Sequence, residues 1–342
     1  MAQQIELTER PDELSQRLQS YVQSGNLNFL LGSGASVPAI NTVGSIEKEI
    51  NELIVAGKQD DADIRSLEFV EKLSAEHGAL HAKTHSAEFS ATLAGYVDFV
   101  RAIDAILFQR KNDLLPRQAN VFTTNYDMFV ELAAGRIPAL VLNDGFSRAA
   151  AMDTKFSFAP ERYTDRTYRS GSIYNHPSEI PTVNLIKLHG SLSWRRDGDS
   201  IVYDTTPVGA LPQADRTNSA KVQEHIEKFF LILPNIWKFH ATIMERVYYD
   251  LLRIYANALQ LENALVICFG FSFEDEHILD ITRRALRNPT AQLIIFSYSH
   301  DDASRFISKF ENQRNVLVIA PRHGEHIDFA RLNELLRTII PK

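Results

Sequence analysis

Apolar residues in the last third of the chain form short uninterrupted runs, and each run is followed by a turn and an amphipathic helical pattern. The three units cover residues 263–286, 291–310 and 315–339. Runs without polar interruption are typical of strands that are covered on both faces. Strands that alternate with helices predict an α/β fold with a doubly wound, mainly parallel, Rossmann-like sheet.

The first two thirds of the chain carry the same alternation at wider spacing. An amphipathic helix is expected over residues 11–24, where Leu14, Leu18 and Val22 share one face. A second helix is expected to start at Asp127. Further strands and a long helix are expected, the strands within residues 28–34, 121–124, 139–143 and 182–191 and the helix over 239–261.

Three segments interrupt the alternation. Residues 41–118 have helical patterns and almost no strand signal, which indicates a helical insertion. Residues 146–181 and 195–225 lack a clear period and are interpreted as irregular excursions over the surface. By length the chain is one large domain with insertions or two ordinary ones, and we interpret residues 1–342 as a single α/β domain.

Small and polar residues gather where five predicted strands end. Ligands of parallel α/β sheets bind outside the carboxyl ends of the strands. Small and hydroxyl residues suit phosphate and ribose, whereas Asn, Asp and His suit bond-breaking chemistry. The five ends are Gly32 to Ser36, Thr123 to Asp127, His189 to Ser191, Gly270 to Ser272 and Ser297 to Ser299. Together they predict a nucleotide site along this rim.

The first strand end, residues 32–36, is a glycine-rich segment that we call the glycine turn. Two glycines two positions apart allow a phosphate to approach the backbone closely. A dinucleotide fingerprint requires a third glycine where this chain has Val37. Taken alone, the pattern fits a tight strand-to-helix turn as well as it fits a nucleotide site.

Composition narrows the partners and the location. A net charge of −7 gives no electrostatic footprint for nucleic acid, so direct nucleic-acid binding is not expected. The N-terminus lacks the basic and apolar regions of a secretory signal, and no apolar run approaches the roughly 20 residues of a membrane span. We therefore expect a cytoplasmic protein. The single cysteine, Cys268, excludes an intramolecular disulfide and a zinc site built from several cysteines.

The motifs and their order resemble those of sirtuins. GSGAS at 32–36, TTNYD at 123–127, KLHGS at 187–191 and GFS at 270–272 are similar to the sirtuin NAD-binding blocks GAGxS, TQNxD, LHG and GTS. The variants look closer still to bacterial sirtuin-like (SIR2-like domain) NADases of anti-phage defence, which often carry LHGSxxW and GFSF followed by acidic residues. The resemblance spans about residues 28–299 and implies a sirtuin-type fold that binds NAD as substrate.

The resemblance also implies individual roles. Asn125 would help to position the attacking water beside the nicotinamide ribose, Asp127 would accept the nicotinamide carboxamide, and His189 would be the general base. The glycine turn would hold the pyrophosphate through backbone N–H groups. The implied NAD contacts besides Asp127 are Gly32, Ser33, Gly34, Ala35, Ser36, Thr124, Gly270, Ser272 and Ser297.

The leading functional hypothesis is an NAD+ glycohydrolase. Nicotinamide departs neutral from an oxocarbenium-like state, so a placed water and a base near neutral pH suffice without a strong acid. The four zinc-binding cysteines of sirtuin deacylases are absent, and VPAINTVGS at 37–45 replaces their GIPxFR motif. We therefore expect hydrolysis by water, no zinc and no other metal. The alternatives are an NAD-dependent deacylase or ADP-ribosyltransferase, and a non-catalytic NAD- or ADP-ribose-binding regulatory subunit.

An unregulated NADase would exhaust the NAD of its own cell, so the resemblance implies a control device. Sirtuin-like chains of about this size are often paired with a HerA-type hexameric DNA-translocating ATPase. The expected partners are therefore NAD+, further copies of this chain in a homo-oligomer, and a HerA-type ATPase.

Several of these residues also have purely structural interpretations. Asn125 fits the N-cap of the following helix, and Asp127 fits a first-turn carboxylate that favours its dipole. His189 fits a packed histidine at a strand end, and Trp194 is interpreted as a packing residue. The acidic stretch FEDEHILD at 273–280 suggests a cation site, yet acidic residues are expected at any helix start.

A histidine triplet in the predicted insertion has the spacing of a metal site. His77, His81 and His85 stand at i, i+4 and i+8, which would place three imidazoles on one helical face. Gly78 weakens such a helix, and no carboxylate completes the site at the same spacing. The favoured interpretation is therefore a solvated face.

Overall fold

The computed structural model describes most of the chain. The described residues are 2–7, 11–40, 44–78, 85–110, 114–148, 155–170, 177–198, 200–206, 208–232 and 245–340. Of the helices within these ranges, none is both long enough and apolar enough to cross a membrane.

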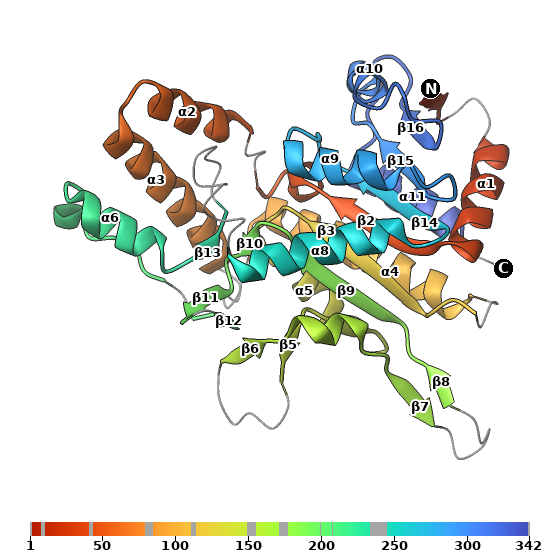
Figure 1. The fold of residues 1–342 in the computed structure, drawn as a ribbon, viewed down its shortest axis with the longest axis horizontal. Coiled ribbons are helices and arrows are strands. Elements are labelled where there is room, and N and C mark those ends of the chain that lie inside the picture. Colours follow the sequence, from red (N-terminus) through yellow and green to blue (C-terminus); the bar gives the residue numbers. More distant parts are fainter. Residues whose placement is uncertain are drawn as a thin grey trace.

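Eight strands form one central sheet in which every neighbouring pair is parallel (Figure 1). Their spatial order is β1 (Gln3–Glu6), β16 (Val316–Ala320), β15 (Gln292–Phe296), β14 (Ala264–Phe269), β2 (Asn26–Leu31), β3 (Gln118–Thr123), β9 (Thr182–Lys187) and β4 (Val141–Asn143). The predicted parallel α/β sheet is confirmed. The edge strand β1 was not predicted, because it is short and partly exposed and therefore has no buried apolar run.

The chain changes direction across the sheet at β2. After β2 it builds β3, β4 and β9 on one side, and helix α8 (Arg246–Gln260) then precedes β14, which pairs with the other side of β2. The carboxyl ends of β2 and β14 therefore flank a topological switch point, the place where open α/β sheets bind ligands.

Helices cover both faces of the sheet, as doubly wound folds require (Figure 1). On one face Phe29 packs in a cluster with Val22 of α1 and Phe99 of α4. On the other, Cys268 packs with Leu251 of α8 and Ile278 of α9. The helices of the two layers are α1 (Pro11–Ser24), α4 (Ala87–Phe108), α5 (Phe129–Ala134) and α11 (Phe329–Thr338) on the first face, and α8, α9 (Glu276–Ala285) and α10 (His300–Lys309) on the second.

A row of asparagines crosses the sheet at one level. The Nδ2 atom of Asn120 donates to Asn28 Oδ1 at 2.8 Å, that of Asn184 to Asn120 Oδ1 at 3.0 Å, and that of Asn143 to Asn184 Oδ1 at 3.0 Å. These residues are partners in the strand register. A slip of any strand would leave buried amides unpaired, so the row helps to specify the register.

The segment 41–118, interpreted from the sequence as an insertion, has two parts in the structure. Helices α2 (Gly44–Val55) and α3 (Gln59–Gly78) pack on each other, α3 also contacts α6 (Ser219–Ile226), and all three lie away from the sheet (Figure 1). Helix α4 belongs to the layer on the sheet, where Phe99 contacts Phe29 edge to face at 5.0 Å.

The segments interpreted as irregular excursions contain short strands. A small antiparallel sheet has the order β11-β12-β6-β5, and β7 pairs with β8. Trp194, the first residue of β11, is 2% exposed and packs on Phe146 of β5 and Phe158 of β6, so it is a packing residue as predicted. The short strands of these two sheets are β5 (Phe146–Ser147), β6 (Phe156–Phe158), β7 (Tyr168–Ser170), β8 (Pro177–Glu179), β11 (Trp194–Asp197) and β12 (Ser200–Tyr203). Outside the two segments, β10 (Gly190–Ser191) pairs with β13 (Phe230–Leu231).

Candidate functional site

The glycine turn is pressed against the segment that follows β14. Gly32 N donates to Phe269 O at 3.1 Å, and Gly34 N donates to Gly270 O at 3.0 Å. A Cβ on Gly32 would lie 2.4 Å from Gly270 O, so only glycine permits this approach. Ala35 N donates to Gly32 O. These three N–H groups would therefore reach a pyrophosphate only by giving up their bonds to backbone carbonyls.

Substitution of Gly270 tests how much the contact between Gly270 and the glycine turn contributes to the free energy of unfolding. The φ of +67° at Gly270 disfavours a side chain, and a Cβ would lie 2.6 Å from Ala35 N. Gly324 has a similar φ of +83° with nothing within 4 Å of its Cβ position. We expect Gly324→Ala to lower the free energy of unfolding by about 1–2 kcal/mol, the cost of the left-handed conformation alone. Gly270→Ala should cost clearly more in urea unfolding, and equal losses would show that the contact is unimportant.

Ser36, Asn125 and Asp127, all predicted as site residues, meet in one buried hydrogen-bond network. Asn125 Nδ2 donates to Gly32 O and to Ser36 Oγ, both at 3.0 Å. Ser36 Oγ donates to Asp127 Oδ2 at 2.6 Å. The network joins the end of β2 to the end of β3 and holds the Asn125 amide in one orientation.

Tyr96 completes this network and was missed by the sequence analysis. Its hydroxyl lies 2.9 Å from Ser36 Oγ and 3.4 Å from Asn125 Nδ2. Because the single Ser36 proton is directed to Asp127, Tyr96 donates to Ser36. Burial raises the pKa of Tyr96 well above its usual value, so the hydroxyl keeps its proton. No local signal marks Tyr96, which is one of many apolar-face positions of α4.

Removal of the Tyr96 hydroxyl should weaken the network without destroying it. Tyr96→Phe removes the hydrogen bond to Ser36 and the longer contact with Asn125, while the bonds of Ser36 to Asn125 and Asp127 remain, so we expect the free energy of unfolding to fall by about 0.5–1.5 kcal/mol. Tyr298→Phe is the matched control, because Tyr298 is 57% exposed and should leave stability unchanged. Thermal or urea unfolding of both variants measures the difference, and equal stabilities would contradict a structural role for the hydroxyl.

The N-cap interpretation of Asn125 is wrong. The N-cap of α5 is Met128, so Asn125 lies three residues outside the helix and is held by the network instead. Asp127 does serve the helix start, because its Oδ1 accepts from Phe129 N at 3.3 Å. The Asp127 carboxylate therefore has two roles: it accepts a backbone N–H at the start of α5, and it accepts the hydrogen bond from Ser36.

A buried ion pair between Lys187 and Glu131 lies next to this hydrogen-bond network. Lys187, at the end of β9, lies 2.7 Å from Glu131 Oε1, donates to Ser191 Oγ at 2.9 Å and donates to the Asp127 carbonyl oxygen. The side chains of Lys187 and Glu131 are 2% and 10% exposed. Burial raises the pKa of Glu131, and the Lys187 ammonium opposes this shift. The pair ties the end of β9 to the segment that carries Asp127.

His189 lies two residues after the end of β9 and is nearly buried. Burial lowers its pKa, although the Asp275 carboxylate opposes the shift, so the imidazole is neutral at neutral pH and can accept a proton. His189 Nε2 lies 3.7 Å from Asp275 Oδ1, beyond hydrogen-bond range. Among the described residues, Nε2 has no hydrogen-bond partner.

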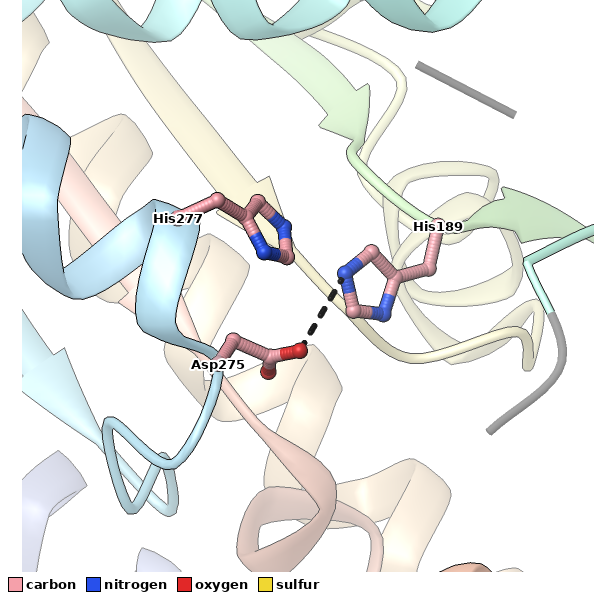
Figure 2. A group of neighbouring side chains, drawn as sticks. All are labelled: His189, Asp275 and His277. Atoms are coloured by element: carbon pink, nitrogen blue, oxygen red, sulfur yellow. Dashed lines mark ion pairs between the residues drawn. The ribbon is translucent and has the colours of Figure 1, made fainter. Parts of the chain in front are cut away.

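Asp275 and His277 come to His189 from the start of α9, and the three side chains point toward one another (Figure 2). The rings of His189 and His277 have centroids 5.8 Å apart. Burial, with a contribution from His189, lowers the pKa of His277 to about 4. From the sequence, this acidic stretch suggested a cation site but was also expected from the helix dipole; the structure shows that it meets His189. The sequence did contain a signal for this group, because Asp275 and His277 stand two positions apart shortly after a predicted strand.

The segment 270–275 links the two parts of the rim. At one end Gly270 touches the glycine turn, and at the other end Asp275 faces His189. The Asn125 network and the His189 group thus lie along one edge of the sheet, at the carboxyl ends of β2, β3, β9 and β14. This edge therefore carries a neutral imidazole, an amide and a carboxylate held by hydrogen bonds, and glycines that allow a ligand to approach the backbone closely.

Three other predicted site residues, Thr124, Ser272 and Ser297, have the following positions. Thr124 N donates to Leu31 O at 3.3 Å, and Ser272 is exposed after β14. Ser297 is buried, and its Oγ donates to Ile319 O at 3.1 Å, so its hydroxyl is engaged by the neighbouring strand.

The histidine triplet and one cavity are the two further candidates. His81 and the side chain of His77 fall outside the described residues, whereas His85 stacks on Phe89 with centroids 4.7 Å apart. A cavity of about 330 Å³ lies beside α6 and is lined by residues of α6 and of the segment 208–215. It contains none of the predicted site residues.

Comparison with known protein families agrees with the fold. The family model described as SIR2-like domain matches residues 119–319. The match begins in β3 and ends in β16, so it includes Asn125, His189 and the start of α9. No curated protein matches the chain.

Proposed function

The chain belongs to the SIR2-like domain family, and from this premise we propose that it is an NAD+ glycohydrolase that cleaves NAD+ to nicotinamide and ADP-ribose. SIR2-like domains use NAD. The observation that carries the proposal is the meeting of Ser36, Asn125 and Asp127 in one network, with a neutral His189 on the same edge.

In the proposed reaction, water adds to C1′ of the nicotinamide ribose as the bond to nicotinamide breaks. His189 takes the proton of the water, and nicotinamide leaves as a neutral molecule with the bonding electrons. Both Nδ2 protons of Asn125 are directed to Gly32 O and Ser36 Oγ, which turns Oδ1 to the other side of the amide. We assign this oxygen the role of accepting a hydrogen bond from the water.

The binding contacts proposed for NAD follow the strand ends. The pyrophosphate is proposed to lie against the glycine turn, and the nicotinamide carboxamide against Asp127. Thr124, Gly270, Ser272 and Ser297 are proposed to line the remainder of the dinucleotide. Because Ser297 Oγ already donates to a backbone carbonyl, its contact to ribose would be as an acceptor.

The test is direct. Purified full-length protein is incubated with NAD+, with and without an acylated peptide, and the products are separated by chromatography. We expect nicotinamide and ADP-ribose in equal amounts and independently of the peptide. Acyl-ADP-ribose would indicate a deacylase instead, and binding of NAD+ that stays intact would indicate a regulatory subunit.

We propose further that this hydrolysis serves anti-phage defence by depleting NAD, under control of self-association or of a HerA-type hexameric ATPase. The same assay, run over a range of protein concentrations and with such an ATPase added, tests the control. Hydrolysis per chain should rise with self-association or on addition of the ATPase. A rate per chain that is constant under all these conditions would contradict the control.

A further inference from the structure

His189, Asp275 and His277 form a compact group of metal-ligand types. One ligand atom from each lies within 4.8 Å of the other two, and His189 Nε2 is 3.7 Å from Asp275 Oδ1. The three come from two separate elements, the end of β9 and the start of α9, and point toward a common centre (Figure 2).

The separations are near those that zinc imposes. Two ligands at about 2.0–2.1 Å from a tetrahedral zinc ion are roughly 3.3 Å apart. The separation between His189 and Asp275 exceeds this value by about 0.4 Å, and the other two separations exceed it by at most about 1.5 Å, differences that side-chain torsions can close. Two imidazoles and one carboxylate with an open fourth position are a common ligand set for Zn²⁺ and other divalent transition metals.

The second observation is the buried Nε2 of His189. This atom has no hydrogen-bond partner among the described residues, although its side chain is only 10% exposed. Buried polar atoms without a partner are rare in folded proteins and often indicate an ion or a water. His189 Nε2 faces Asp275, so an ion bound between the three side chains would satisfy it.

We propose that His189, Asp275 and His277 bind a divalent transition-metal ion, with Zn²⁺ as the best fit, and that this ion inhibits the chain. The inhibition rests on the proposed NADase function. A metal that takes the lone pair of Nε2 leaves this nitrogen unable to accept the proton of the attacking water, and it fixes the ring to α9. The site contains no cysteine, so it revises the expectation from the cysteine count that the chain holds no zinc.

Metal binding is measured first and without reference to activity. Full-length protein is treated with a chelator and dialysed, and Zn²⁺ is titrated by calorimetry. Co²⁺ is then titrated as a spectroscopic probe of tetrahedral nitrogen and oxygen coordination. We expect one ion per chain, with affinity at least 10-fold lower in His277→Ala and in Asp275→Asn. The two variants are independent, so a folding defect in one, seen by circular dichroism, leaves the other decisive.

His323→Ala is the matched control. His323 is exposed and stacks on His300 with centroids 3.7 Å apart, so this pair is the competing surface site for zinc. The control should bind Zn²⁺ as the unmodified chain does. Loss of binding in His323→Ala with full binding in His277→Ala and Asp275→Asn would overturn the proposal, as would an unmodified chain that binds no zinc.

Inhibition is measured second, as the Zn²⁺ concentration that halves the NAD+ hydrolysis rate of each protein relative to its own metal-free rate. This concentration should rise at least 10-fold in His277→Ala and stay unchanged in His323→Ala. Zinc binding without any NAD+ cleavage would refute the proposed function and leave the metal site standing. NAD+ cleavage with no zinc binding would refute the metal site alone.

Discussion

We expect His189→Ala to lower the rate of the proposed NAD+ hydrolysis by about 10²- to 10⁴-fold, the usual contribution of a positioned general base. The expectation follows from the place of His189 at the end of β9 and from its neutral ring, whose pKa is lowered by burial. The rate is measured by release of nicotinamide from NAD+ in buffer that contains a chelator, which removes the effect of the proposed zinc ion.

The controls for this prediction separate chemistry from folding. His323→Ala removes an exposed imidazole and should keep the full rate. Circular dichroism and thermal unfolding should show that most of the His189→Ala protein is folded at the assay temperature. Any unfolded fraction should be too small to account for the loss of rate. A folded His189→Ala protein that hydrolyses NAD+ at the normal rate would remove His189 from the mechanism.

Lys187→Met lowers the free energy of unfolding by about 3–5 kcal/mol at neutral pH. The reason is that Glu131 would stay buried while its cation is lost, and an unpaired buried charge is strongly destabilising. Urea unfolding measures the loss. Lys221→Met is the matched control: Lys221 pairs with Asp215 at 2.6 Å on the surface, where one ion pair contributes less than about 1 kcal/mol.

The destabilisation by Lys187→Met should depend on pH with a definite sign. The pKa of Glu131 is already raised by burial, and removal of the Lys187 ammonium raises it further above the ordinary value of 4.5. The folded chain then binds more protons than the unfolded chain, so stability falls as pH increases from about 4.5 through the folded pKa. The deficit relative to the unmodified chain should therefore be smaller at pH 5 than at pH 8. An equal deficit at both values would place the loss in packing instead of charge.

The contrast between Asn125 and Tyr96 shows how far the candidate site was predictable. Asn125 and Asp127 stand directly after a strand and were found from that position and from the sirtuin-like motif. Tyr96 is equally close to Ser36 in space, but it lies on a helix where every fourth position is apolar for packing. A tyrosine that donates a hydrogen bond and one that only packs have the same local pattern.

Asp275 and His277 show a different limit. Both residues were visible in the sequence, and the helix dipole explained the acidic run sufficiently. Their contact with His189 depends on which strands lie side by side, since β14 and β9 are separated in the sheet by β2 and β3. Only the path of the segment 270–275 along the sheet edge brings the start of α9 to the end of β9.

The sequence by itself determined the alternation of most sheet strands with helices, the parallel α/β class and the motifs at the strand ends, because hydrophobic period and turn residues act over a few neighbouring positions. The tertiary structure alone decided that α4 supplies Tyr96 to the network, that Lys187 neutralises Glu131, and that two residues of α9 join His189. Each of these contacts joins residues far apart in the chain. Their partners are chosen by strand order and helix packing, which local patterns do not specify.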